Sequence, residues 1–473
     1  MNGTCPYPSV RVGVAPVAAV GSAGGVLLTE VVALSGLTSA LSRGLERWRK
    51  PTARHDPAKV LTDLALTLAL GGDCLADAAL LRSEPEVFGS VGSEATVSRT
   101  ITALAADASR VLSVIARVRR DVRSRVWGLA GKASPLAGAS EDMPLVIDMD
   151  ATIVIAHSEK EAAAPTFKKT FGHHPLLAFL DHGPGGGGEL LAGLLRPGNA
   201  GSNTAADHIE VTRQALAGIL GINPSRPGRK ILIRTDGAGA SREFLTFLTR
   251  RGLAYSIGWT LPWAQMSEIY QAVTTADGWT PALTAAGEVN EHADIADITD
   301  LLTQCGHLQG WPAGMRIIVR RERPHPGARV AQDRLDDADG YRLTAFATNA
   351  RRGQLQTLEL RHRQRARCED RIRCAKDTGL RNLPLKTLAQ NQIWLQVVAL
   401  AGDLLAWLGL LGLRDDASRR WEPKRLRLRL FSAPAVIARH ARRVLLHVKE
   451  TYHWATLVLA AHQRLRALTT APT

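Results

Sequence analysis

Residues 144–150 read Pro-Leu-Val-Ile-Asp-Met-Asp, a short apolar run that ends in acids. An apolar run of this length predicts a buried strand. Two further runs, 174–181 and 189–196, are separated by the glycine-rich segment 183–188, which predicts an antiparallel hairpin. The first strand and this hairpin together predict a meander of three strands.

Helices and strands then alternate along the chain. We expect a helix over 204–220, a strand over 229–236, a helix over 241–250 and a strand over 253–257. Three meandering strands followed by alternating helices and strands are the order of a ribonuclease-H-like mixed sheet, whereas a doubly wound sheet alternates from its start. The predicted fold class is therefore α/β with a ribonuclease-H-like core.

The charge balance of the chain predicts an anionic partner. Its 473 residues include 59 Lys and Arg against 44 Asp and Glu, a net charge of +15. For a chain of this size, nucleic acid is the first candidate. The most apolar segment, 393–413, is interrupted by Gln396 and Asp403, which favours a buried core helix over a membrane span. We therefore expect a nucleic-acid partner and no membrane contact.

Cysteine usage indicates the compartment. The five cysteines are scattered and form no Cys-x-x-Cys pair. This pattern argues against a zinc ribbon and a disulfide scaffold and is typical of a reducing cytoplasm. The N-terminus shows no credible signal peptide, so the predicted location is cytoplasmic.

One segment of the N-terminal region has the features of a turn followed by a helix. Ser93 is placed to cap the helix, and Thr96, Ser98, Arg99 and Thr100 follow it. This pattern resembles the turn and recognition helix of a helix-turn-helix, which predicts a DNA contact at Arg99. A plain helical hairpin explains the same residues nearly as well, and both interpretations stay open.

A strongly basic segment near residue 370 carries two acids, Glu369 and Asp370. Its seven cations are Arg361, Arg363, Arg365, Arg367, Arg371, Arg373 and Lys376. Drawn as one helix, it places His362, Arg365, Glu369 and Lys376 within a stripe of roughly 60° on one face. A carboxylate among so many basic groups predicts a metal ligand or catalytic acid surrounded by phosphate-binding side chains. A solvated basic helix with incidental acids is the alternative.

Three carboxylates of the chain could form one site. Asp150 ends the first strand, Asp236 ends a later strand, and Glu369 lies on the basic helix. Strand ends in an α/β sheet meet at the crevice where ligands bind. Oxygen ligands favour Mg²⁺ or Mn²⁺, and two such ions can support phosphodiester cleavage. Asp148 lies on the same strand face as Asp150 and is the alternative first ligand.

These motifs resemble those of the DDE transposases of bacterial insertion sequences. That family has D-x-T after a strand, an Asp after a later strand, and a helix with the pattern Y-x2-R-x3-E-x6-K. This chain has Asp150-Ala-Thr152, Asp236-Gly and His362-x2-Arg365-x3-Glu369-x6-Lys376. The runs Leu195-Arg-Pro-Gly-Asn199 and Cys368-Glu-Asp-Arg-Ile372 resemble the thirteen-eighty group of these elements.

The resemblance implies a cut-and-paste transposase. Such an enzyme binds double-stranded DNA at terminal inverted repeats, cleaves it with two Mg²⁺ ions (or Mn²⁺), and joins the freed 3′ hydroxyl to target DNA. Asp150, Asp236 and Glu369 take the catalytic and metal-binding roles, with Asp150 favoured over Asp148 because Thr152 follows it. A homodimer in the synaptic complex and a bacterial, nucleoid-associated location are also implied.

The resemblance also implies the DNA contacts. His362, which stands where the family has Tyr, contacts DNA phosphates together with Arg365 and Lys376, and we add Arg367 and Arg373 from the same basic segment. In relatives with a strand-rich insertion before the Glu, a Trp stacks on a base. The candidates here are Trp259, Trp263, Trp279 and Trp311, and core packing is the alternative role for each.

The chain is predicted to divide into five segments. They are a helical N-terminal DNA-binding region (1–140), the first part of the catalytic core (141–258), an inserted subdomain (259–340), the second part of the core with the Glu369 helix (341–413), and a basic, mostly helical C-terminal region (414–473). In the last segment, the alternation over 425–431 predicts a strand with one basic face, and we expect helices at 434–448 and 451–467.

Two other functions fit parts of the sequence. The run from Val146 to Thr152 also fits the D-x-D-x-T strand of haloacid-dehalogenase-type phosphatases, but that fold needs parallel strands with crossover helices and does not account for the charge. The second is a DNA-binding relative of a transposase that no longer cleaves DNA. The presence of all three acids argues against it.

Overall fold

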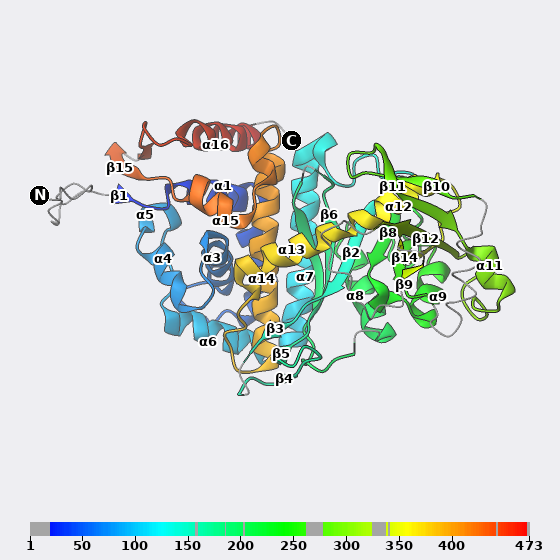
Figure 1. Cartoon of the computed structure of the whole chain (residues 1–473). Helices are drawn as coiled ribbons and strands as arrows, with labels where there is room; N and C mark the ends of the chain where they lie inside the picture. The colour runs from blue at the N-terminus through cyan, green and yellow to red at the C-terminus, as the bar shows by residue number, and fades with distance from the viewer. Residues whose placement is uncertain are drawn as a thin grey trace, which may run out of the picture.

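The largest sheet of the molecule is mixed and lies to the right of the long helices in Figure 1. A computed structural model of the chain describes residues 19–156, 159–184, 186–201, 204–261, 278–323, 337–338, 341–440 and 443–470. The strands run in the order β10-β11-β12-β14-β9-β8-β2-β6-β7, and β13 also pairs with β14. The five strands nearest the predicted acids are β2 (Leu145–Ala151), β6 (Leu176–Asp181), β7 (Gly188–Leu194), β8 (Ile231–Thr235) and β9 (Ala254–Trp259).

The pairing of these five strands confirms the predicted strand order. β2 pairs antiparallel with β6, and β6 pairs antiparallel with β7, which is the expected meander. On its other side β2 is parallel to β8, and β8 is parallel to β9. The antiparallel meander contradicts the haloacid-dehalogenase alternative, because that fold requires parallel strands with crossover helices after the first strand.

The stretch predicted as an inserted subdomain extends the same sheet. Its described strands are β10 (Thr280–Leu283), β11 (Val289–Asp297), β12 (Arg316–Glu322) and β13 (Asp337–Ala338), with helix α11 (Thr299–Gln304) between β11 and β12. β12 pairs with β14 (Tyr341–Thr348), which pairs with β9. In the described residues, the stretch adds strands to the edge of the core sheet beyond β14, so its pairing does not set it apart as a separate subdomain.

Helices cover both faces of the sheet. On one face lie α8 (Ala205–Ala217) and α9 (Arg242–Arg250), and the Thr212 hydroxyl of α8 reaches the Met149 sulfur of β2 at 3.4 Å. Neighbouring side chains of a strand point to opposite faces, so Asp148 and Asp150 face the other way. That second face carries α12 (Leu355–Arg363) and α13 (Arg367–Ala375), as Figure 1 shows where α13 crosses β2 and β6.

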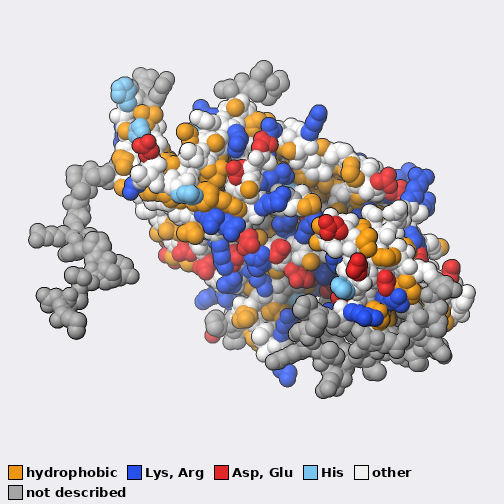
Figure 2. Space-filling view, turned by 45° about the horizontal axis from the view of Figure 1, so that its top comes forward, with side chains coloured by type: hydrophobic (Ala, Val, Ile, Leu, Met, Phe, Trp, Pro, Cys, Tyr) orange, Lys and Arg blue, Asp and Glu red, His pale blue; other side chains and the backbone are white. Residues whose placement is uncertain are grey.

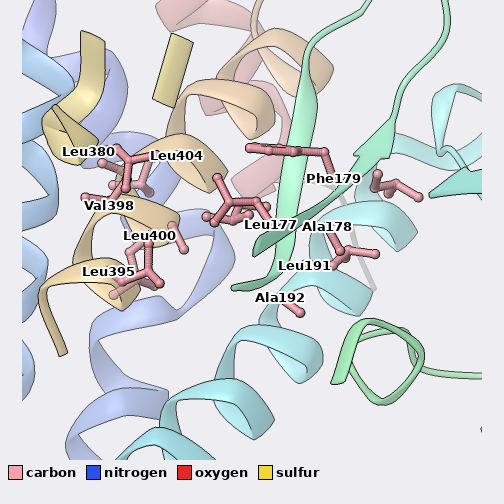
Figure 3. Packing of buried hydrophobic residues seen from close by; sticks show 14 of the residues in the cluster. Leu177, Ala178, Phe179, Leu191, Ala192, Leu380, Leu395, Val398, Leu400 and Leu404 are labelled. Carbon is pink, nitrogen blue, oxygen red and sulfur yellow. The ribbon is translucent and has the colours of Figure 1, made fainter. Parts of the chain in front are cut away.

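A long apolar helix, α14 (Leu388–Leu411), joins the sheet to the N-terminal helices. It packs on β7 and on four N-terminal helices: α1 (Val26–Ser35), α3 (Pro57–Leu70), α6 (Glu94–Ala105) and α7 (Ala108–Ala130). Figure 3 shows Leu395, Val398 and Leu404 of α14 in one buried cluster with side chains of β6 and β7, and Leu395 lies against Gly193 of β7. By length and composition α14 could cross a membrane, but 83% of its most apolar window is buried by the rest of the chain.

The C-terminal region differs from the sequence prediction. The residues expected to form a basic strand are helical, in α15 (Pro423–Leu426) and a π-helical turn, Arg427–Phe431. The residues expected to form a helix at 434–448 are two strands, β15 (Ala435–His440) and β16 (Arg443–Val448), and β15 also pairs with β1 (Ala19–Val20). The predicted last helix is present as α16 (Ala455–Thr470).

Residues 425–431 are helical because their leucines are buried at helical spacing. Leu426 and Leu430, four residues apart, are both buried, whereas Leu428 between them is 72% exposed. A spacing of four places two residues on the same face of a helix. A strand with alternating leucines would have buried Leu428 as well.

Candidate nucleic-acid cleavage site

Asp150 and Asp236 lie side by side at one edge of the sheet. In the parallel pair of β2 and β8, Met149 is in register with Thr235, so the next residue of each strand is an aspartate. Asp236 is held in a tight turn, where its Oδ1 accepts a hydrogen bond from the Ala238 amide at 3.1 Å. The backbone of β9 passes close to this turn at Gly258, where a Cβ would lie 2.7 Å from the Gly237 nitrogen. The predicted convergence of the two acids is thus a direct result of strand register.

The electrostatics of this pair favour a bound cation. The pKa of the Asp150 carboxyl is raised to about 6, first by burial and second by the charge of Asp236, against the lowering effect of Arg365. A positive charge placed between the two carboxylates would offset this unfavourable charge. The donor set is oxygen only, which suits a hard divalent ion.

Asp148 is not available as a ligand in this structure. It is buried, and both of its oxygens accept hydrogen bonds from the Arg234 guanidinium, at 2.6 and 2.8 Å. Asp150, by contrast, is only partly paired. The geometry therefore favours Asp150 as the first acid, in agreement with the D-x-T pattern.

Arg234 also anchors the helices that carry Glu369, a role that the sequence analysis missed. Its Nη1 donates to the Arg361 carbonyl of α12 at 2.5 Å, and its Nη2 lies 3.3 Å from an oxygen of Asp181. Asp181 in turn accepts a hydrogen bond from Arg367 at 2.9 Å and lies 3.6 Å from Arg371. The signal that could have revealed this network is the charged residue inside the apolar strand Ile-Leu-Ile-Arg-Thr, because a buried charge needs partners.

Glu369 lies on α13, and Arg365 bridges it to the sheet. A 3-10 turn, Gln364–Ala366, separates α12 from α13, so the predicted single helix is broken at Arg365. The Arg365 guanidinium lies 3.3 Å from Asp150 Oδ2 and 3.8 Å from Glu369 Oε1. The Glu369 side chain is 70% exposed. The structure therefore brings all three predicted acids to one region, and we name Asp150, Asp236 and Glu369 the acid site.

The ligand oxygens of the three acids do not all lie within 4.8 Å of one another. In the described part of the chain, one group of His, Cys, Asp or Glu residues has ligand atoms that all lie within 4.8 Å of one another: Asp73, Cys74 and Asp77. That group lies in the N-terminal helical region, and Asp77 already accepts backbone hydrogen bonds from Asp73 and Cys74. At the acid site, the Arg365 guanidinium lies between the carboxylates of Asp150 and Glu369.

The position of His362 does not support the predicted phosphate contact. Its ring stacks on Phe346, with centroids 4.4 Å apart, and its Nδ1 lies 2.8 Å from the Ser256 hydroxyl. The pKa of His362 is lowered to about 3, first by burial and then by the charges of Arg365 and Arg234. At neutral pH the ring is uncharged and packs against the sheet. Arg365 and Glu369 of the predicted stripe do face each other, whereas His362 is turned into the sheet.

The other predicted DNA contacts on this segment differ in their pairing. Arg367 is bonded to Asp181, and Arg373 is paired with Glu422 at 2.5 Å and with Asp370 at 2.9 Å. Lys376 is partly buried at the start of a π-helical turn, and burial lowers its pKa. Figure 2 shows Lys and Arg side chains gathered across the centre of one face, with Asp and Glu among them.

Arg99 lies apart from the acid site, on the exposed face of α6. The predicted cap is confirmed, because the Ser93 hydroxyl accepts a hydrogen bond from the Thr96 amide. A groove lies beside this helix, and we call it the basic groove. Its polar lining residues are Lys50, Thr52, Arg54, His55, Arg82, Ser90, Ser93, Thr96, Arg99 and Thr100. No Asp or Glu is among its described lining residues, so the groove is suited to an anion such as a DNA phosphate.

The candidate tryptophans serve partly in packing. The rings of Trp259 and Trp311 meet edge to face with centroids 4.5 Å apart, and Arg321 lies 4.0 Å above the ring of Trp279. Trp263 lies outside the described residues. Of the two cysteines in the basic segment, Cys368 is fully buried and serves as a packing residue, whereas Cys374 is partly buried.

Comparison with known proteins identifies a family and similar solved structures. The family model described as "Transposase DDE domain group 1" matches residues 4–470. A solved structure, "Cryo-EM structure of piggyBac transposase synaptic complex with hairpin DNA (SNHP)", is similar over 94% of this chain and 82% of that chain, with 10% identity and a TM-score of 0.41. None of the curated proteins matches the chain.

Proposed function

The chain belongs to the DDE transposases of group 1, and from this premise we propose that it is a cut-and-paste DNA transposase. It would bind terminal inverted repeats, hydrolyse a phosphodiester bond at each end and join the 3′ hydroxyl ends to target DNA. The observation that carries the proposal is the register of β2 and β8, which sets Asp150 beside Asp236 under the helix that carries Glu369. The strand order is that of a ribonuclease-H-like core, which we propose as the fold of the catalytic part.

The proposed cofactor is a pair of Mg²⁺ ions, for which Mn²⁺ would substitute. DDE transposases use divalent metal ions, and the acid site fits such ions because its donors are all carboxylate oxygens and because the charge of Asp236 raises the pKa of Asp150, an effect that a bound cation would offset. When bound, the ions would activate the attacking oxygen and stabilise the leaving oxygen. Asp150, Asp236 and Glu369 are the residues that would hold them.

Arg365 has a separate role in this proposal. Its guanidinium neutralises Asp150 and Glu369 in the protein alone, at 3.3 and 3.8 Å. A DNA phosphate is an equally good partner for a guanidinium. Exchange of Arg365 from the carboxylates to the scissile phosphate would place DNA at the acid site and release Asp150 and Glu369 for metal binding. Lys376 would hold a neighbouring phosphate.

The basic groove is the proposed site for the terminal repeats. Arg99, Arg54 and Lys50 form no ion pair within the described residues, so their charges are available to DNA. Exposed Ser and Thr hydroxyls beside them can also bond phosphate oxygens. We further propose that the enzyme acts as a homodimer, because two DNA ends must be joined, and that it works in the cytoplasm on the bacterial nucleoid.

The test is metal-dependent cleavage of the DNA that flanks the gene. Wild-type protein should cut with Mg²⁺ at matching inverted repeats on either side of the gene, and Asp236→Ala should bind but not cut. Binding without cutting by the wild type, in Mg²⁺ and in Mn²⁺, would favour the non-cleaving DNA-binding relative. Cutting by both proteins would show that the acid site is misplaced.

A further inference from the structure

A short hairpin leaves the sheet at the edge that carries the acid site. Strand β2 ends at Ala151, which pairs with Leu176, the first residue of β6. The Thr152 amide donates to the Pro175 carbonyl at 3.1 Å, so the chain leaves and returns at the Asp150 end of β2. The excursion forms a separate sheet of β3 (Val154–Ile155), β5 (Phe171–His173) and β4 (Ala164–Pro165), seen near the start of α14 in Figure 1.

The base of this hairpin is held rigidly. Gly172, at φ 158°, lies so close to β3 that a Cβ would be 2.1 Å from the Val154 carbonyl oxygen. At Gly198 a Cβ would be 2.2 Å from the Ala164 carbonyl oxygen. The Arg196 guanidinium donates to the His174 carbonyl at 2.9 Å. The motif Leu195-Arg-Pro-Gly-Asn199 therefore serves to fix the hairpin against the sheet.

The tip of the hairpin is a closed turn that exposes an aromatic ring. The hydroxyls of Thr166 and Thr170 lie 2.7 Å apart, and the Thr166 amide donates to the Thr170 carbonyl at 2.8 Å. Between them, Phe167 is 71% exposed and Lys168 and Lys169 are exposed as well. Lys169 has φ 58°, in the left-handed region that non-glycine residues rarely adopt. The tip therefore presents one apolar ring and two cations on a rigid support.

The hairpin leaves the sheet at the Asp150 end of β2, and Lys168 of its tip is near Lys376 of the segment that carries Glu369. Burial lowers the pKa of the Lys376 ammonium, and the charges of Arg381 and Lys168 lower it further, so Lys168 is a neighbour of Lys376. Lys376 belongs to the same segment as Glu369. Isolated exposed apolar residues are common on proteins. An exposed ring followed by two cations, on a hairpin that leaves the sheet at the edge holding the acid site, is a more specific arrangement.

We propose that the hairpin tip, Phe167, Lys168 and Lys169, contacts DNA beside the bond that is cleaved, with the lysines on phosphates and the Phe167 ring stacked on an unstacked base. Apolar side chains act in this way where proteins distort a duplex, and every base offers a face for stacking, so the contact does not depend on sequence. This inference rests on the proposed transposase function. It assigns the step of opening the DNA near the acid site to a residue outside the acid site.

The test uses the full chain and a DNA fragment that contains the gene with its flanking sequence. The first measurement is made in Ca²⁺: permanganate oxidises unstacked thymines and so reports DNA opening. The second is made in Mg²⁺: the rate of DNA cleavage reports activity. We expect Phe167→Ala to bind DNA like the wild type, to lose the thymine reactivity next to the cut, and to cleave about tenfold or more slowly. Phe167→Trp should retain both signals. Lys168→Ala with Lys169→Ala should weaken binding and reduce its salt dependence.

Met143 supplies a matched control. It is 71% exposed, as Phe167 is, but it precedes β2 and so lies at the opposite end of that strand from Asp150. Met143→Ala should leave thymine reactivity and cleavage unchanged. Cleavage by Phe167→Ala at the wild-type rate would overturn the inference while leaving the proposed function intact. A wild-type protein that neither binds nor cuts the fragment would overturn both.

Discussion

Two clusters of charge in this molecule have opposite character. In the first, which we call the buried network, Arg119 and Arg123 of α7 meet Glu189 of β7 and Asp403 of α14, all of them buried. Arg123 lies 2.5 Å from Glu189 and 3.4 Å from Asp403, and Arg119 lies 2.9 Å from Asp403. In the acid site, Arg365 is shared by Asp150 and Glu369, Asp236 has no ion pair among the described residues, and Glu369 is mostly exposed.

The difference is visible in the pKa of Glu189 compared with the pKa of Asp150. Burial by itself raises the pKa of Glu189, but the charge of Arg123 and the hydrogen bond from His182 lower it more, so Glu189 stays below its ordinary value. Asp150 has the ion pair with Arg365, but burial and the charge of Asp236 outweigh it, and the pKa of Asp150 is raised to about 6. Fully paired buried charges hold helices to the sheet, whereas under-paired charges at the sheet edge remain available for a ligand.

The largest expected effect is on chemistry at the acid site. Glu369→Gln keeps the size of the side chain but removes a metal-binding charge, so DNA cleavage should fall about 10³-fold, roughly 4 kcal/mol of barrier. Because Glu369 is exposed and forms only a 3.8 Å ion pair, the thermal unfolding midpoint should change little. The neighbouring Asp370→Asn, also on the surface, should cleave at the wild-type rate. Equal losses in both variants would contradict the assignment of Glu369.

The buried network should show the reverse behaviour. Arg123→Met leaves Glu189 and Asp403 short of a partner, and we expect the free energy of unfolding to fall by about 3–5 kcal/mol. Denaturant unfolding measures this quantity. The control is Arg117→Met, an exposed arginine on the same helix, which should change stability by about 0.5 kcal/mol or less. A similar small change for Arg123→Met would remove the distinction between the two clusters.

Asp150→Asn should stabilise the protein at neutral pH. The folded pKa of about 6 exceeds the ordinary 3.8, so the folded state binds this proton more tightly than the unfolded state does. Stability associated with the group is therefore present below pH 3.8 and is lost as pH rises to about 6, by roughly 3 kcal/mol at most. Asn has no such penalty, and we expect a gain of about 1–3 kcal/mol at pH 7.5.

The pH dependence of this gain separates the account from a simple packing effect. The advantage of Asp150→Asn should shrink between pH 6 and pH 4, as the wild-type carboxyl becomes protonated. Unfolding curves measured without divalent ions at several pH values give the comparison. A gain that is the same at pH 4.5 and pH 7.5 would mean that ionisation of Asp150 is not its cause.

The smallest expected effect is again in the buried network. The Trp127 indole donates to Glu189 at 2.9 Å, but Glu189 also receives hydrogen bonds from Arg123, His182 and Trp407. Trp127→Phe removes one donor of several, so we expect a loss of about 1–2 kcal/mol in unfolding free energy. A loss as large as that of Arg123→Met would show that the network depends on each member equally.

The same contrast explains what the sequence could predict. The strands, the hairpin and the acids at strand ends follow from runs of a few residues, and the register of β2 and β8 then brings Asp150 to Asp236. The pairing of Arg123 with Asp403 joins residues 280 positions apart, and no local pattern predicts such a partner. The basic helix was predicted as one element because its spacing fits 100° per residue, and the 3-10 turn at Arg365 breaks that regularity.

The most direct test of the account is to map a bound metal on the protein itself. Fe²⁺ in place of Mg²⁺, with ascorbate and peroxide, generates hydroxyl radicals that cut the polypeptide next to its ligands. The account predicts fragments from cuts near Asp150, Asp236 and Glu369, all lost in Asp236→Asn. Cuts confined to Asp73–Asp77, or cuts near the acid site that persist in Asp236→Asn, would contradict the claim that the three acids form one metal site.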